Sequence, residues 1–306
     1  MFPSYLELWT TGELRERAQK AGKILQACQL CPRRCGVDRT RGERGFCRSG
    51  LRPMVSSYHV HHGEEPPISG SRGSGTIFLT RCNLHCVFCQ NYPISQLGVG
   101  QKKSVEELGQ MMLDLQNRGC HNLNWVTPTH FVPQILEALC FAVERGFRLP
   151  LVYNTNGYDS LETLGLLDGI VDIYLPDMKY GDEETARTYS QAPGYPAINA
   201  TAVQEMYRQV GKGRYAKDGT MARGMIIRHL LLPNGLSATE NMARFVAGTL
   251  SGQCPISLMT QFFPAYRAKD FPKLNRRLNR REFKEALEIL ERYRLRRGWM
   301  QEMGEN

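Results

Sequence analysis

Apolar runs of strand length alternate with helix-length amphipathic patterns along most of the chain after residue 75. The strand-like runs cover residues 76–80, 122–127, 150–156, 171–178, 224–232 and 256–263. Helical patterns follow near residues 103–118, 132–146, 159–167, 182–212 and 238–250. This alternation predicts an α/β fold with a parallel sheet and crossover helices. About six β/α units are too few for a closed eight-unit barrel, so we expect a partial (β/α)6 barrel or an open doubly wound sheet.

The length and composition are those of an ordinary globular protein with one large domain. The chain has 306 residues, of which 42% are hydrophobic and 23% are charged. We expect residues 75–265 to form the barrel. Residues 1–74 should form a smaller, mostly irregular segment with a helix near 10–27. We expect this segment to bind a metal ion, because irregular chain of that length usually needs a stabilising cross-link. Residues 266–306 should add a basic amphipathic helix packed on the barrel.

Three cysteines follow the first predicted strand directly. Cys82, Cys86 and Cys89 form a C-x3-C-x2-C loop in the sequence RCNLHCVFCQN. Short thiolate spacing of this kind suits an iron–sulfur cluster, and three ligands leave one iron open to another molecule. Structural zinc with His85 as a further ligand is an alternative, and buried core cysteines are a second.

Polar residues also lie at or just past the ends of other predicted strands. They are Asn154, Asn156, Asp177 and Lys179. Because the carboxyl ends of parallel strands meet at one rim, these side chains and the triple-cysteine loop should converge there.

The C-x3-C-x2-C loop, with Phe88 before its last cysteine, resembles the signature of the radical S-adenosylmethionine (SAM) superfamily. The resemblance implies a [4Fe–4S] cluster on the three cysteines, with SAM bound at the open iron and cleaved reductively to a 5′-deoxyadenosyl radical. The implied cofactors are chemically consistent with one another, because SAM together with an iron–sulfur cluster is a vehicle for radical reactions.

Further segments between residues 72 and 265 are similar to the family of pyruvate formate-lyase activating enzymes. These segments are YNTNG at 153–157, PDMK at 176–179 and IIRHLLLPN at 226–234. The resemblance implies SAM contacts from Asn154, Asn156, Asp177, Lys179 and Arg228. Asn154 stands where that family usually has an aspartate.

The chain departs from that family after the second predicted strand. The Gly-Gly-Glu segment that grips the SAM amino group there is missing, and WVTPTH at 125–130 stands in its place. Thr127, Thr129 or His130 could supply acceptors instead, although His130 could equally satisfy a helix end. The departure implies a distinct branch of activating-enzyme homologues, and the resemblance does not identify its substrate.

A second cysteine array precedes the predicted barrel. Cys28, Cys31, Cys35 and Cys47 have C-x2-C-x3-C-x11-C spacing, which predicts a closed four-thiolate metal centre. A cysteine–proline pair favours an auxiliary iron–sulfur cluster, and zinc is the alternative. We expect the remaining cysteines, Cys120, Cys140 and Cys254, to be core residues. We expect His59, His61 and His62 to be solvated loop residues.

Partners and location follow from charge and from the resemblance. The N-terminus lacks the apolar core of a secretory signal, and no run approaches the ~18 apolar residues of a membrane span, so we expect a cytoplasmic protein with no membrane contact. The resemblance implies a low-potential electron donor such as flavodoxin or ferredoxin. It also implies a glycine of a partner glycyl-radical enzyme as substrate, while a peptide or a small molecule is the alternative.

Two rival classes remain at the level of the sequence. An iron–sulfur electron carrier would use both cysteine arrays without SAM. Such a carrier needs no cleft, so the polar residues at the predicted strand ends argue against this class. A zinc-dependent nucleic-acid-binding protein would explain the net charge of +9. That class also demands aromatic residues beside the basic ones, and they are nearly absent around the N-terminal cysteine array.

Overall fold

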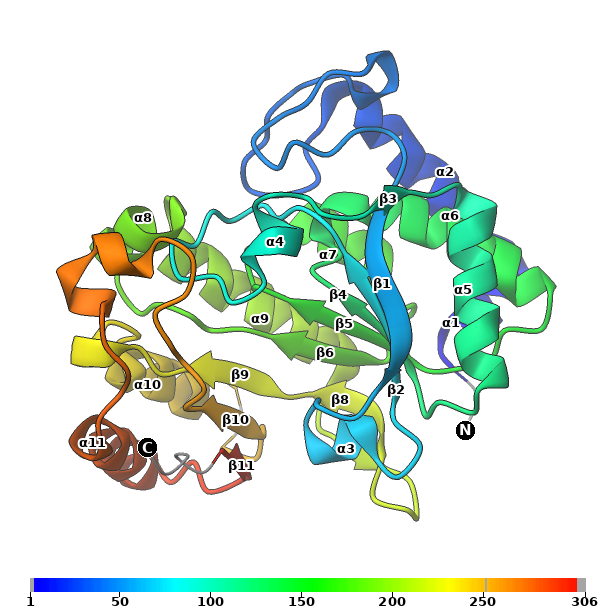
Figure 1. The fold of residues 1–306 in the computed structure, drawn as a ribbon. Coiled ribbons are helices and arrows are strands. Elements are labelled where there is room, and N and C mark those ends of the chain that lie inside the picture. The colour runs from blue at the N-terminus through cyan, green and yellow to red at the C-terminus, as the bar shows by residue number, and fades with distance from the viewer. Residues whose placement is uncertain (1–2, 251, 302–306) are drawn as a thin grey trace.

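The computed structural model, which describes residues 3–250 and 252–301, has an α/β fold built on a mostly parallel sheet (Figure 1). Eight strands lie in the order β3-β1-β2-β4-β5-β6-β8-β7, and a second sheet has the order β11-β10-β9. A parallel bridge between Asp177 and Arg228 joins the two sheets. The parallel strands do not close into a complete barrel, so the predicted partial barrel is confirmed.

The strands have the following bounds: β1 Met54–His61, β2 Ser74–Leu79, β3 Gln101–Lys102, β4 Leu123–Val126, β5 Leu151–Thr155, β6 Ile173–Pro176, β7 Arg214–Tyr215, β8 Met221–Met225, β9 Ile227–Leu230, β10 Ile256–Met259 and β11 Gly298–Met300. The α-helices are α1 Tyr5–Thr11, α2 Glu13–Ile24, α3 Pro66–Ser69, α4 Tyr92–Ser95, α5 Val105–Asn117, α6 Val132–Glu144, α7 Leu161–Leu167, α8 Glu183–Ser190, α9 Tyr195–Val210, α10 Thr239–Thr249 and α11 Arg280–Arg292.

The two faces of the parallel sheet formed by β4–β6 carry separate apolar cores, because successive side chains along a strand point to opposite faces. Leu151 and Tyr153 of β5 belong to the large core that β4–β6 share with the crossover helices. Val152 of the same strand belongs to a smaller cluster on the opposite face, with Ile173 and Leu175 of β6. Asn124 and Asn154 alternate with residues of the large core, so they share the face of the smaller cluster.

Helix α3 packs against the face of the sheet that carries the smaller apolar cluster. Its Ile68 is fully buried in the smaller cluster, beside the residues of β5, β6 and β8. The helix begins with two prolines in its first turn, where a missing N–H costs nothing. It ends at Gly70, where the φ of +49° favours glycine and where a Cβ would lie only 2.6 Å from Thr220 Cγ2. Apolar packing therefore closes one end of the barrel interior and leaves the other end polar.

Two elements differ from the sequence-based expectation. Residues 224–232 form two strands rather than one, because β8 pairs with β6 while β9 pairs with β10. The helical stretches predicted between residues 182 and 212 are present as α8 and α9, with Gly194, which has a φ of 70°, between them. The expected loop histidines His59 and His61 lie instead in β1, which pairs with β2 in antiparallel register. That loop interpretation was wrong, since both rings pack against Phe78 of β2.

The terminal segments flank the barrel. The predicted N-terminal helix is present as α1 and α2, and the predicted C-terminal amphipathic helix is α11. A capping box of Asn279 and Glu282 starts α11. The chain then adds β11 alongside β10, and Trp299 packs against the smaller apolar cluster. Among the described residues, no helix has the length and apolar character needed to cross a membrane.

Candidate active site

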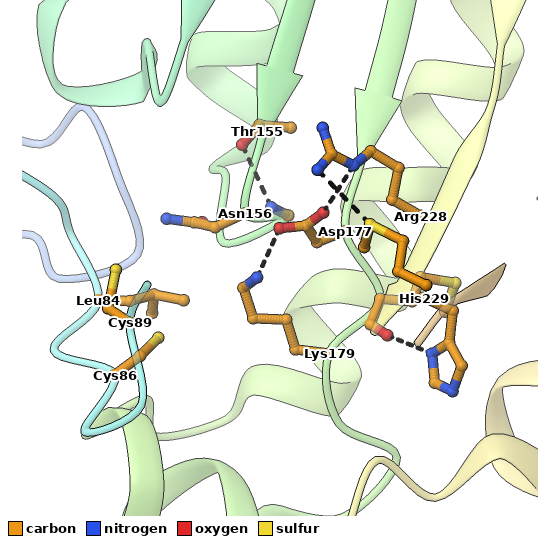
Figure 2. A network of polar contacts seen from close by, with 12 residues as sticks. Leu84, Cys86, Cys89, Thr155, Asn156, Asp177, Lys179, Arg228 and His229 are labelled. Atoms are coloured by element: carbon orange, nitrogen blue, oxygen red, sulfur yellow. Dashed lines mark hydrogen bonds and ion pairs between the residues drawn. The ribbon is translucent and has the colours of Figure 1, made fainter. Parts of the chain in front are cut away.

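The triple-cysteine loop leaves the carboxyl end of β2 and rests on the end of α8. His85 N–H donates to the Ser190 carbonyl at 3.1 Å, and Val87 N–H donates to the Tyr189 carbonyl at 2.8 Å. These bonds hold the loop beside the rim of the barrel. Figure 2 shows Cys86 and Cys89 on this loop, facing the group that contains Lys179 and Asp177.

Each of the three sulfurs has a polar neighbour. The Asn156 amide donates to Cys82 Sγ at 3.2 Å, and Ser190 Oγ donates to Cys86 Sγ at 2.9 Å. Cys89 Sγ and Ser95 Oγ lie 3.1 Å apart. Hydrogen bonds to sulfur are among the factors that tune a cluster held by cysteine thiolates. The donor set of this loop therefore fits an iron–sulfur cluster.

Burial keeps these thiols protonated in the absence of a metal ion. It raises the pKa of Cys86 to about 11, with the Lys179 ammonium acting in the opposite direction. It also raises the pKa of Cys82 and of Cys89. Across the described residues, no three Cys, His, Asp or Glu side chains stand at a spacing that would hold a metal ion. Ligation would thus draw the thiolates together and release their protons.

Two cations and one carboxylate converge next to this loop (Figure 2). Lys179 Nζ lies 2.5 Å from Asp177 Oδ2, and Arg228 Nε lies 3.5 Å from Asp177 Oδ1. Burial disfavours the charged form of Lys179, but Asp177 and Cys86 more than offset it, so the pKa of the ammonium group is raised. Both cations therefore stay charged at neutral pH, and the structure brings these three predicted site residues together.

Glu64 and Glu65 complete the cluster, although sequence reasoning did not assign them to the site. Glu64 Oε2 lies 3.5 Å from Arg228 Nη1, and Glu65 Oε1 lies 3.6 Å from Arg228 Nε. The amide of Asn124 donates to Glu64 Oε1 at 2.9 Å, and that of Asn154 donates to Glu64 Oε2 at 3.5 Å. A pair of acidic residues directly before a Pro-Pro turn was the only signal in the sequence that could have pointed to them.

Asn156 links the cysteine loop to the strand ends. Its amide donates to Asn83 Oδ1 at 2.7 Å as well as to Cys82, and its Oδ1 accepts from Tyr158 N–H at 2.9 Å. These contacts already engage the side chain that the resemblance assigned to SAM. In the structure, Asn156 orients the loop that carries Cys82.

The two threonines proposed as replacement acceptors have different surroundings. Thr127 is partly exposed after β4 and has a left-handed φ of 56°. Thr129 is fully buried, and its hydroxyl donates to Asp159 Oδ1 at 2.7 Å. Thr155 and Tyr153 donate to the same carboxylate. Thr129 therefore satisfies a buried acid, and Thr127 is the one of the two with exposed surface.

The neighbouring histidine is also engaged within the protein. His130 Nε2 lies 2.9 Å from the Thr80 carbonyl, and the ring is 1% exposed. The His130 carbonyl accepts from Arg39 Nη1 of the N-terminal segment at 2.7 Å. His130 thus ties this segment to the end of β2, and its ring contacts a carbonyl after a strand rather than the helix end of its predicted structural role.

The four N-terminal cysteines surround one small cavity. Cys28, Cys31, Cys35 and Cys47 line it together with Arg33 and other residues of the same segment. Burial raises the pKa of Cys31 to about 12, and the neighbouring thiols of the array add to the effect. Arg33 Nε donates to the Asn83 carbonyl at 3.1 Å, so the array docks directly on the loop of the other cysteines.

Buried His229 is expected to make the free energy of unfolding fall as the pH is lowered. Its Nδ1 lies 2.6 Å from the Met178 carbonyl, and Nε2 lies 3.1 Å from Thr239 Oγ1. Burial lowers the pKa of His229 from 6.5 to about 4. Because the folded pKa is depressed, the unfolded chain takes up the proton first as the pH falls, and the stabilisation present above pH 6.5 is lost toward pH 4. The loss between pH 7 and 5 should be about 2 kcal/mol.

Urea unfolding of the wild type and of His229→Asn at pH 7 and pH 5 measures this effect. The variant should lose less stability than the wild type over that interval. Buried carboxyls with raised pKa values, such as Asp159 and Asp172, change stability in the opposite direction but are common to both proteins. Equal losses in the two proteins would show that His229 does not contribute.

Comparisons with known proteins agree with this geometry. The family model described as the Radical SAM superfamily matches residues 76–221. The chain is 33% identical over 289 residues to an uncharacterized protein of Methanocaldococcus jannaschii, MJ0674, covering 91% of this chain and 78% of the relative. A second protein of that organism, MJ0808, is 23% identical over 266 residues, covering 80% of this chain and 73% of the relative.

Among solved structures, the fold is similar to that of Streptococcus suis SuiB bound to S-adenosylmethionine. The TM-score is 0.51 at 9% sequence identity, and the match covers 73% of this chain and 48% of SuiB. The chain thus spans about half the length of SuiB, and the likeness is one of fold. With the family match and the cysteine loop at the end of the first barrel strand, it follows that the chain belongs to the radical SAM superfamily.

Proposed function

We propose that this protein uses Cys82, Cys86 and Cys89 to hold a [4Fe–4S] cluster and cleaves SAM to generate a radical that abstracts hydrogen from a substrate. The observation that carries the proposal is the set of three thiols, two buried and one partly buried, each with a polar neighbour and beside two partly buried cations. When bound, the cluster supplies the electron that breaks the bond between the SAM sulfur and C5′.

The chain's own residues bind and orient SAM. Arg228 and Lys179 offer positive charge to the SAM carboxylate or ribose, and Asp177 holds both cations in place. Asn154 and the partly exposed Thr127 lie at the ends of neighbouring strands and are further candidates for contacts. Asn156 positions the cysteine loop. Closing the barrel interior with α3 excludes water from the radical.

The substrate we propose is a glycine of a partner enzyme, because residues 153–157, 176–179 and 226–234 are similar to segments of the pyruvate formate-lyase activating enzymes. The changed segment at 125–130 supports a different ligand contact, so a peptide or a small molecule is the second candidate. A flavodoxin or a ferredoxin would supply the electron, and the cytoplasm is the compartment that suits these reactions and ten free cysteines.

We also propose that the N-terminal array binds metal, as an auxiliary iron–sulfur cluster or as zinc. The support is that four thiols line one cavity and that Arg33 joins their segment to Asn83. The metal-binding part of residues 1–74 would then end before β1, because β1 and α3 belong to the barrel.

Anaerobic purification followed by a single-turnover assay tests the function. The protein should be brown, with iron and sulfide of about four atoms each per chain for one cluster and about twice that for two. After reduction and addition of SAM, 5′-deoxyadenosine should appear in chromatography. A protein with an intact cluster that forms no 5′-deoxyadenosine would overturn the proposal. Zinc without iron would favour the nucleic-acid-binding alternative.

A further inference from the structure

The carboxylates of Glu64 and Glu65 enter the barrel from a segment that is held rigidly. Ser69 Oγ lies 3.1 Å from Glu64 N and 3.2 Å from Glu64 O, and Ile68 N–H donates to the Glu65 carbonyl at 2.8 Å. The Asn122 amide donates to the Ile68 carbonyl at 2.7 Å and so ties α3 to the start of β4. The two side chains are therefore presented by a fixed backbone rather than by a mobile linker.

Two buried acceptor atoms in this cluster, Glu65 Oε2 and Asn124 Oδ1, have no hydrogen-bond partner within the described part of the chain. Asp177 Oδ1 also makes no hydrogen bond there, but it faces Arg228 Nε at 3.5 Å, a donor that is itself without a hydrogen bond. The Glu65 side chain is 7% exposed and Asn124 is fully buried. Because the Asn124 amide nitrogen is committed to Glu64, its oxygen must face the other way as an acceptor. Each such buried group costs about 1–3 kcal/mol when it is left unpaired, so a donor from outside the chain is expected.

The charges in the cluster do not balance. Among the described residues, Arg228 is paired with the three carboxylates of Glu64, Glu65 and Asp177, while Lys179 is paired with Asp177. The three contacts of Arg228 are 3.5–3.6 Å long, which exceeds the length of a good charge-assisted hydrogen bond. A buried excess of negative charge needs a proton or a cation. Burial accordingly raises the pKa of Glu64, although Arg228 opposes the effect.

We propose that Glu64, Glu65 and Asn124 form a subsite for a primary ammonium group, carried by the substrate or by SAM. An ammonium group has three donors and no acceptor, and it supplies the missing positive charge. Asn124 is a mid-strand residue of β4, and Glu64 and Glu65 reach the same inner face from the segment between β1 and α3. The assignment to these two sources rests on the proposed function.

Thermal unfolding of the full-length, cluster-reconstituted protein with n-butylammonium chloride tests the subsite, with 1-butanol at equal ionic strength as the neutral control. The cation should raise the Tm by roughly 2–4 °C at about ten times its Kd, and the alcohol should not. Glu64→Gln and Glu65→Gln should each remove the shift. Glu288→Gln should keep it, because that carboxylate is 60% exposed on α11, outside the barrel.

Repeating the measurement with saturating SAM distinguishes the two sources. A shift that persists assigns the subsite to the substrate, and a shift that disappears assigns it to the SAM ammonium group. Equal effects of the cation and the alcohol on the wild type would overturn the inference, as would a shift that both glutamine variants retain. The first measurement needs neither SAM nor turnover, so its result stays interpretable for a protein that holds the cluster but forms no 5′-deoxyadenosine.

Discussion

Cys86→Ala protein is expected to form no 5′-deoxyadenosine above background and to hold about four fewer iron atoms per chain than the wild type. Cys86 is 8% exposed and lies in the middle of the triple-cysteine loop, where Ser190 donates to its sulfur. Two remaining thiols would tether the cluster at two irons only. Iron and sulfide analysis, together with chromatography of the SAM reaction after reduction, measures both losses.

Cys140→Ala is the matched control for this variant. Cys140 lies on α6, outside the cysteine loop, and packs partly buried against the large core. Its loss should leave the iron content and 5′-deoxyadenosine formation near the wild-type values. A Cys86→Ala protein that keeps its full iron content and its activity would mean that another ligand set holds the reactive cluster.

The strands of the barrel could be predicted because each is an apolar run of suitable length between turns. The break between β8 and β9 could not, since residues 224–232 have the length and the mostly apolar character of one strand. The break depends on pairing: Gly224 has a φ of 141°, and the chain moves from β6 to β10 within a few residues. Strand β1 was missed because only Val55 of its eight residues is fully buried, so its sequence lacks the usual alternation.

The site was predictable only where chain position determined it. Asp177 and Lys179 follow directly after β6, so topology alone brings them to the rim. The contact of Glu64 with Arg228 joins residues far apart in the sequence and depends on how α3 packs inside the barrel. Thr129 was predicted as a possible ligand contact, but its hydroxyl donates to buried Asp159. Asp159 belongs to the next β/α unit, so the sequence around Thr129 does not reveal this hydrogen bond.

Arg228→Met is expected to lower the free energy of unfolding by about 3–5 kcal/mol at pH 8, the usual cost of removing one partner from a buried ion pair. Arg228 lies within 3.5–3.6 Å of three carboxylates, and its side chain is 19% exposed. Its removal leaves Asp177 paired with Lys179 and takes away the ion-pair partner of Glu64 and Glu65. Urea unfolding followed by circular dichroism measures the loss. Arg208→Met is the control and should cost much less, because that side chain is 60% exposed on the surface of α9.

The pH dependence of this loss tests its electrostatic origin. Burial already raises the pKa of Glu64 above 4.5, and Arg228 is the largest influence in the opposite direction. Without Arg228 the folded pKa rises further, so the folded variant holds its proton to a higher pH than the unfolded chain. Its stability relative to the wild type should therefore be best at acidic pH and should fall as the pH rises through the raised pKa. A deficit that is equal at pH 5.5 and pH 8 would indicate that Arg228 stabilises the barrel by packing alone.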